Sequence, residues 1–432
     1  MSRFKDLQKN LFGGTTSNAR QFGMIFTLVA IVLLFQFLTD GLTLRSDNLI
    51  ALFQQNSYIL ILAIGMLMVI VAGHIDLSVG SIAAFTGILV AKSMADWHLS
   101  WPLAIVFGLV VGALIGAWQG FWVAYIGVPA FIVTLAGMLI FRGGNQVIGN
   151  ANTIPVPEPF RVIGSGFLPE VGPSTGYNNL TLLLGLAACV AVVWRELQSR
   201  KTRREMDADA APLWVSILRM AVMVGVILFV TLRFASGRVG TSFPVSGIIL
   251  VALVILYSFY TRNTPGGRYI YAVGGNSRAA ELSGVKLRRV NFYVMMNMSV
   301  LAALAGMIFV ARSAASGPQD GNGWELDAIA AVFIGGAAVS GGIGTISGSI
   351  VGGLVMAVLN NGLQLLGVGT DRVQIIKGLV LLLAVALDVY NKSQGRFSVI
   401  GSIMRPFRRE APAVPVSSSD AGREPATTTV SG

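Results

Sequence analysis

The chain has 432 residues, of which 54% are hydrophobic and 12% are charged, and its net charge is +11. The charged fraction is about half that of an ordinary soluble domain, which excludes a soluble globular fold. The basic residues do not alternate with aromatic residues as in a nucleic-acid groove, so we expect no nucleic-acid partner. Cys189 is the single cysteine, which excludes an intrachain disulfide.

Apolar runs of the length that crosses a bilayer as a helix recur along the whole chain. Twelve candidate spans, two of them short, lie at 22–38, 58–72, 82–95, 103–125, 130–141, 180–194, 213–232, 245–260, 290–310, 328–339, 346–366 and 373–389. The sequence therefore predicts an all-α, polytopic integral membrane protein. We expect a transmembrane domain over 22–390, an N-terminal segment over 1–21, and a disordered tail over 391–432 that is rich in Pro, Ser and Thr.

The basic residues cluster between spans, and every cluster follows an even number of crossings. The positive-inside rule then places both termini on the cytoplasmic side of the membrane, together with the loops 195–212 and 261–289. The Gly- and Pro-rich loop 148–177 carries few basic residues and is expected to be the largest external loop.

Several chemistries are missing from the sequence. It contains no GxxxxGK[ST] phosphate loop, no HExxH and no GxSxG, and only two histidines, so we expect neither an enzyme nor a metal site. Any energy source must be another chain or an ion gradient. Gly108, Gly112, Gly116 and Gly120 recur every four residues, a pattern that favours close helix packing over ligand binding.

The segment GHIDLSVGSIAAFTG (73–87) interrupts apolar sequence with Asp76, followed by Ser78. An acid at this position can cap the helix that follows. Alternatively, a polar break within the membrane lines a cavity, because irregular backbone is tolerated there only against protein or water. The two interpretations remain open.

The segment 261–289 (TRNTPGGRYIYAVGGNSRAAELSGVKLRR) is too ordered in composition for a random linker. Pro265, Gly266 and Gly267 indicate a turn, and Ser277 can cap a short helix that ends near Gly284. This helix suits the docking of a soluble partner, or it lies on the lipid headgroups.

Three separated motifs carry a family resemblance: GHIDLSVGS, GGRYIYAVGGNSRAAELSGV and ELDAIAAVFIGGAAVSGGIGTISGSIVGG (325–353). Together they resemble the ABC-transporter permeases of the ribose/xylose/galactose family, and 101–143 resembles its xylose-type branch. The resemblance covers about 20–395. It implies a ten-helix permease core with an inserted pair, the sixth and seventh spans, and an inverted repeat relating spans two to five to spans nine to twelve.

The resemblance also implies how the protein is energised. A coupling helix formed by Arg278, Ala279, Ala280, Glu281, Leu282, Ser283 and Gly284 would dock on a separate ABC ATPase. That subunit would use ATP and Mg, whereas this chain would bind no cofactor. The other implied partners are a second permease copy, the lipid of a bacterial inner membrane, and an extracytoplasmic sugar-binding protein that docks on the loops 148–177 and 312–325.

A sugar path needs hydrogen-bonding groups and aromatic faces that bind weakly. The candidates in or beside the spans are Asp76, Ser78, Trp118, Gln119, Trp122, Tyr125, Thr134, Asn145, Gln146, Asn297, Asn360, Asn361 and Gln364. Charges are scarce within the spans, which argues against an ion relay. The leading hypothesis is import of xylose or a related aldose by an ATP-driven system. The alternative is an ion-coupled sugar carrier that acts alone.

Overall fold

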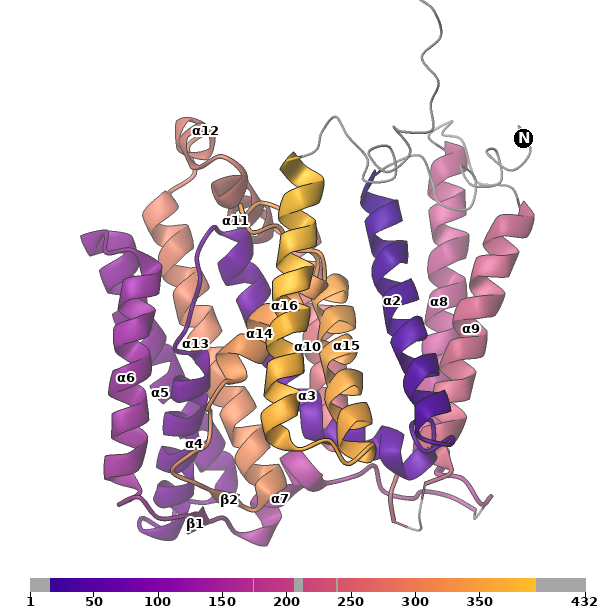
Figure 1. Cartoon of the computed structure of the whole chain (residues 1–432), viewed down its shortest axis with the longest axis horizontal. Coiled ribbons are helices and arrows are strands. Elements are labelled where there is room, and N and C mark those ends of the chain that lie inside the picture. The colour runs from indigo at the N-terminus through magenta and orange to yellow at the C-terminus, as the bar shows by residue number, and fades with distance from the viewer. Residues whose placement is uncertain (1–15, 174, 206–212, 238–239, 394–432) are drawn as a thin grey trace, which may run out of the picture. The chain divides into compact units, whose positions relative to one another are not determined.

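The computed structural model describes residues 16–393 except 174, 206–212 and 238–239 (Figure 1). Residues up to Asp388 form one compact unit, and almost all of their regular structure is helical. The first fifteen residues lie outside the described part. Residues 394–432, most of the tail that we expected to be disordered, also lie outside it. The expected start of the tail at 391 is too early, because the last helix continues to Ser393.

Each of the twelve predicted spans contains or overlaps a helix. These helices are α2 (Thr16–Leu38), α3 (Ser46–Val71), α4 (Val79–Ala95), α5 (Trp101–Phe121), α6 (Ala130–Ile148), α8 (Asn179–Glu205), α9 (Leu213–Ala235), α10 (Val245–Asn263), α13 (Leu287–Ser313), α14 (Trp324–Ile334), α15 (Ile346–Leu365) and α16 (Thr370–Ser393). A π-helical turn, η1 (Trp122–Ile126), extends α5. Eight helices in the described part are long and apolar enough to cross a membrane, counting α5 and η1 together. The protein is therefore a polytopic helical membrane protein.

The two short predicted spans have different outcomes. The span predicted at 130–141 is wrong in length, because α6 continues to Ile148 through polar residues, of which Asn145 is buried. The span predicted at 328–339 is short in the structure as well: α14 has 11 residues, or about 16 Å of helix, against a hydrocarbon core of about 30 Å. Irregular backbone on both sides of α14 completes this crossing.

Two long helices, α3 and α13, form the centre of the compact unit. They pack against each other, and most of their apolar side chains are buried. The glycine stripe of α5 lies against α13: a Cβ at Gly112 or Gly116 would meet the α13 backbone at Ser299 or Met296 within 3 Å. The predicted packing role of these glycines is confirmed, because a larger side chain would push the two helices apart.

The contacts between helices agree with the inverted repeat. The short helix α4 packs against α13, and the short helix α14 packs against α3. In the same way α5 packs against α13 and α15 packs against α3. The helix α3 ends near the end of the molecule where α13 begins, so the two helices run in opposite directions (Figure 1). Each half of the inverted repeat therefore supplies one long helix that packs against the short helix of the other half.

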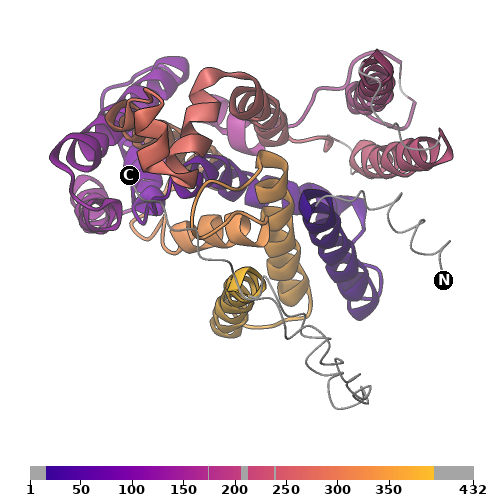
Figure 2. The same cartoon turned by 90° about the horizontal axis from the view of Figure 1, so that it is seen from above.

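The predicted inserted pair, α8 and α9, stands apart from this core. The two helices pack on each other and lie together at the edge of the compact unit in both views (Figures 1 and 2). Their attachment to the core includes the ring of Phe234, which packs edge to face on Phe53 with centroids 5.2 Å apart, and a hydrogen bond between Ser46 and Ser236. The pair is thus an addition to the core and no part of its centre.

Short elements mark the two ends of the compact unit. At one end lie α11 (Pro265–Gly275) and α12 (Ser277–Leu282), together with the first described turn of α2 (Figure 1). At the other end lie α7 (Glu158–Ser165) and a two-stranded antiparallel sheet of β1 (Ile154–Pro155) and β2 (Ala315–Ser316). The sheet joins the predicted loops 148–177 and 312–325.

Candidate functional site: two meeting helix ends and a coupling loop

The N-terminal ends of α4 and α14 meet inside the helical unit. Gly80 in the first turn of α4 lies so close to Gly321, just before α14, that a Cβ at Gly80 would collide with the Gly321 carbonyl and lie 2.6 Å from the Glu325 carboxylate. Irregular backbone leads into both helices, at 72–78 and at 317–323. Such backbone is tolerated at membrane depth only where protein or water covers it. Paired helix ends of this kind form the binding sites of many transporters.

A hydrogen-bonded chain of polar side chains lies at the start of α4. Asp76 is fully buried, and its Oδ1 accepts hydrogen bonds from the Ser78 backbone N–H at 2.8 Å and the Ser78 hydroxyl at 2.6 Å. The Ser78 hydroxyl accepts a bond from Nε2 of Gln119 on α5 at 2.8 Å. Asp76 Oδ2 and Gln119 Oε1 are buried without a partner among the described residues. Asp76 therefore stabilises the turn before α4, whose N-cap is Ser78 without a side-chain cap hydrogen bond, and two acceptors of the network have no partner among the described residues.

The helix α6 adds two buried side chains to the same region. The Thr134 hydroxyl lies 3.4 Å from the Ile75 carbonyl oxygen, in the loop before α4. Asn145 Nδ2 donates to the Gly317 and Pro318 carbonyls at 3.2 and 3.3 Å, in the loop before α14. The helix α6 thus contacts both irregular segments and supplies donors to carbonyl groups that lie outside regular secondary structure.

Eight predicted path residues lie elsewhere. Trp118 is 41% exposed on α5, and Gln364 is exposed at the end of α15. Asn360 is half-buried on α15, whereas its neighbour Asn361 exchanges two hydrogen bonds of 2.9 Å with Asn48. Asn297 belongs to a separate cavity on the far side of α13. Trp122, Tyr125 and Gln146 are likewise exposed. The structure therefore brings together Asp76, Ser78, Gln119, Thr134 and Asn145 only.

The sequence reasoning missed a group of charges on α14 and its neighbours. Glu325 is 6% exposed and lies 3.8 Å from Arg142 of α6. Asp327 forms a 2.5 Å ion pair with Lys377 of α16, and each of these side chains is about a fifth exposed. The signal that could have found them is the sequence WELDAIAA, where two acids open an apolar helix, and Lys377 within an otherwise apolar run.

The loop 261–289 folds into two short helices, α11 and α12. The predicted turn at 265–267 is wrong: Pro265 is the first residue of α11, where its missing N–H costs nothing, and the Thr264 hydroxyl caps the helix. The predicted short helix is present as α12, but its cap is Asn276, whose Oδ1 accepts from the Ala279 N–H at 2.9 Å, and not Ser277. Sequence alone could not separate two adjacent residues that both cap well.

The predicted coupling residues divide into one buried and several exposed positions. Ala280 is 5% exposed and faces the protein, whereas Leu282 is 82% exposed. Arg278, Ala279, Glu281, Ser283 and Gly284 are also exposed, and Gly284 ends the segment with a φ of +86°. A leucine with so little internal contact contributes little to folding, so its exposure suits contact with another surface.

The helix α11 connects this loop to the segment before α4 and to the segment after α14. Its Gly274 packs against the carbonyl of Val71 at the end of α3, and the Gly342 N–H donates to the same carbonyl at 2.8 Å. The Tyr271 hydroxyl donates to the Gly344 carbonyl at 2.8 Å, and burial raises the pKa of this phenol above its ordinary value, so it stays a donor. A displacement of α11 would therefore reach the segments that lead into α4 and out of α14.

The comparisons with known proteins agree with this architecture. The family model described as branched-chain amino acid transport system, permease component, matches residues 48–385. The xylose transport system permease protein XylH of Haemophilus influenzae is 37% identical over 87% of this chain and 98% of its own length. XylH of Escherichia coli K12 is 39% identical over 88% and 95%. The ribose import permease protein RbsC of Escherichia coli K12 is 34% identical over 81% and 87%.

No solved structure matches the chain. The matched region begins within α3 and ends within α16, so it includes both meeting helix ends, the loop with α11 and α12, and the inserted pair. The resemblance that the three motifs indicated is confirmed. The chain belongs to this family of multi-pass ABC-transporter permeases and is a transport component and not an enzyme.

Proposed function

We propose that the protein is the permease subunit of an ATP-driven importer for a monosaccharide, with xylose as the first substrate to test. The observation that carries this proposal is the similarity to the xylose permeases along nearly their whole length, at a higher identity than to the ribose permeases. A second copy of the chain, an ABC ATPase that uses ATP and Mg, and an extracytoplasmic sugar-binding protein would complete the importer. This chain itself would bind no cofactor.

The proposed path passes the meeting ends of α4 and α14. Asp76 Oδ2 and Gln119 Oε1, which have no hydrogen-bond partner among the described residues, would accept hydrogen bonds from sugar hydroxyl groups. Because these bonds to the sugar would be few and weak, the sugar could be released. ATP binding and hydrolysis in the partner would displace α12, and α11 would transmit the displacement to the irregular segments beside Val71 and Gly342. In this proposal the end with α11 and α12 is cytoplasmic, in a bacterial inner membrane, and the sheet of β1 and β2 lies on the face that receives the binding protein.

The buried charged residues are also compatible with a competing function, an ion-coupled sugar carrier. Glu325, Asp327 and Lys377 lie within the helical unit, where ionisable groups often serve ion-coupled transport. An ion-coupled carrier would work without an ATPase. The ion pair of Asp327 and Lys377 fits a structural link between α14 and α16 equally well, so the charges alone do not favour that alternative over the importer.

Reconstitution separates the two functions. Proteoliposomes that contain the chain, the ATPase encoded with it and the binding protein loaded with radiolabelled xylose should accumulate xylose only with ATP and Mg. Omission of the ATPase should abolish uptake. Uptake that persists without the ATPase and follows an imposed proton or sodium gradient would contradict the importer. Competition with unlabelled ribose then tests the choice of sugar.

A further inference from the structure

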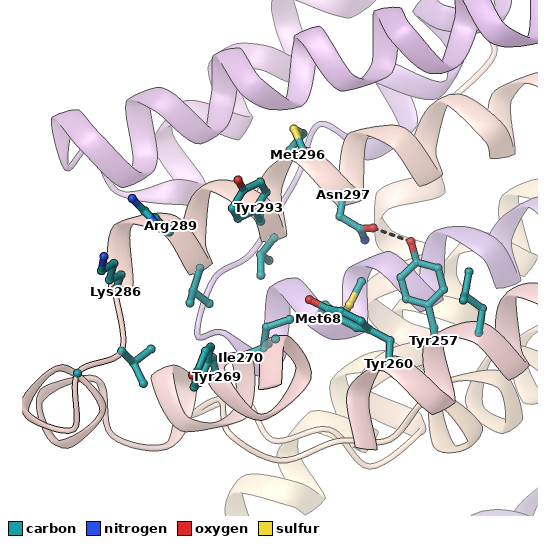
Figure 3. Close-up of a pocket in the computed structure, with 16 residues that line it drawn as sticks. Met68, Tyr257, Tyr260, Tyr269, Ile270, Lys286, Arg289, Tyr293, Met296 and Asn297 are labelled. Atoms are coloured by element: carbon teal, nitrogen blue, oxygen red, sulfur yellow. Dashed lines mark hydrogen bonds between the residues drawn. The ribbon is translucent and has the colours of Figure 1, made fainter. Parts of the chain in front are cut away.

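A cavity of about 650 Å³ lies between α10, α11 and α13, beside the coupling helix (Figure 3). It is separate from the meeting ends of α4 and α14, because none of its lining residues belongs to either helix. Its volume suits a small amphiphile, because ligand pockets usually hold 300–1,000 Å³. Its lining consists mainly of tyrosine and aliphatic side chains.

The cavity runs along one face of α13. Its lining includes Lys286, Arg289, Tyr293 and Asn297, which recur at intervals of three and four residues and thus share a helix face. Asn297 lies ten residues beyond the start of α13, about 15 Å along the helix. This length equals about half of the hydrocarbon core of a bilayer. The cavity therefore has the length of one lipid leaflet.

At the deep end of the cavity, the Tyr257 hydroxyl donates to Asn297 Oδ1 at 2.5 Å (Figure 3). The side-chain nitrogen of Asn297 is buried there without a partner among the described residues. The rim is open and apolar, because Leu256 and Tyr293 are 57% and 58% exposed. An open apolar channel on a membrane helix suits an acyl chain, since lipid tails contact such surfaces directly.

The other end of the cavity is positively charged. Lys286 and Arg289 lie together at this end and are exposed, and the structure describes no ion pair for either (Figure 3). Lys286 is also the N-cap residue of α13 and provides no side-chain cap, so the first amide groups of that helix remain available. Helix N-terminal amides and basic side chains together bind phosphate groups. The loop 261–289 contains six basic residues and one acid, Glu281.

We propose that this cavity binds an anionic phospholipid of the cytoplasmic leaflet, with the phosphate between Lys286 and Arg289 and an acyl chain against Tyr260 and Tyr293. Basic pockets between membrane helices on this side of a bilayer suit such headgroups. The cavity is lined by Gly284 and Val285, which follow α12, so a bound lipid would contact the loop 261–289 and stabilise its position. The proposal goes beyond the proposed function. From that function it takes only the cytoplasmic orientation of the end with α11 and α12.

Native mass spectrometry of the purified full chain tests the proposal. The detergent-solubilised protein is titrated with dioleoyl phosphatidylglycerol, and separately with dioleoyl phosphatidylcholine, which has the same chains and no net charge. We expect retention of phosphatidylglycerol in preference to phosphatidylcholine. The double variant that carries Lys286→Gln and Arg289→Gln should bind phosphatidylglycerol about 30-fold more weakly, since each basic residue near an anionic headgroup contributes about a factor of five.

Two further variants keep the test decisive. Arg195→Gln with Lys201→Gln removes one arginine and one lysine from exposed positions on α8, and should leave binding unchanged. Val290→Trp keeps both cations but fills the cavity, and should abolish retention while the protein remains monodisperse. Equal binding of the two lipids, equal loss in the α8 control, or a change in oligomeric state of the Lys286 and Arg289 variant in place of lipid loss would overturn the proposal.

Discussion

Glycine at position 80 allows the ends of α4 and α14 to touch. Because a Cβ there would collide with the Gly321 carbonyl, Gly80→Ala should destabilise the protein by about 1–3 kcal/mol, the usual cost of overpacking a core. Thermal unfolding in detergent, followed by loss of the monodisperse peak, measures this effect. The matched control is Gly143→Ala on α6, where a Cβ meets nothing within 4 Å and alanine favours the helix. Equal stability of the two variants would show that the close approach is not tight.

Single residues were also where sequence reasoning was least complete. Asp76, Ser78 and Gln119 were chosen separately for their polarity, and the structure places them in one hydrogen-bonded chain. Asn297 was chosen by the same criterion and lies in a different cavity. Polarity inside an apolar span shows that a residue needs a partner, but the partner comes from another helix, whose position the local sequence does not define.

The helix α12, proposed to couple the chain to an ATPase, offers a test that does not disturb folding. Leu282 is 82% exposed, so Leu282→Asp should leave the stability of the protein within about 0.5 kcal/mol of the wild type. If α12 docks in an apolar groove of the ATPase, the variant should lose most of the ATPase that co-purifies with it. Replacement of 278–284 by a Gly/Ser linker should give the same loss. The control Leu366→Asp changes an exposed leucine that follows α15 and should retain the ATPase. Undiminished co-purification of Leu282→Asp would rule out this docking role.

The helices α14 and α16 are joined by the ion pair of Asp327 and Lys377. Lys377→Met leaves the carboxylate without its partner, which should cost roughly 2 kcal/mol; this is less than for a fully buried pair, because both side chains keep about a fifth of their surface exposed. The charge-reversed pair, Asp327→Lys with Lys377→Asp, should recover part of the lost stability. The measurement is a double-mutant cycle of thermal unfolding and sugar uptake. Additive losses in the reversed pair would show that the pair does not stabilise the protein.

The orientation of the whole protein can be tested because Cys189 is its single cysteine. In a Cys189→Ala background, we expect a membrane-impermeant maleimide to label Glu170→Cys in intact spheroplasts, and to label Ser283→Cys only after permeabilisation. Both positions are exposed, and they lie near opposite ends of the compact unit in the loops around α7 and α12. The reverse labelling pattern would refute the cytoplasmic placement of the coupling loop, and with it the proposed path of energy into the permease.

At the scale of the whole molecule, the amino-acid sequence alone determined the membrane environment and the twelve helices that alternate with loops. Apolar runs and charged loops are local properties of the sequence, and each is stable in its own solvent, hydrocarbon or water. It also determined the family, through three motifs. Only the tertiary structure decided that α4 and α14 meet at Gly80, and that Asp327 pairs with Lys377. Both features join residues of different helices, and the hydropathy of one segment carries no information about its neighbours in space.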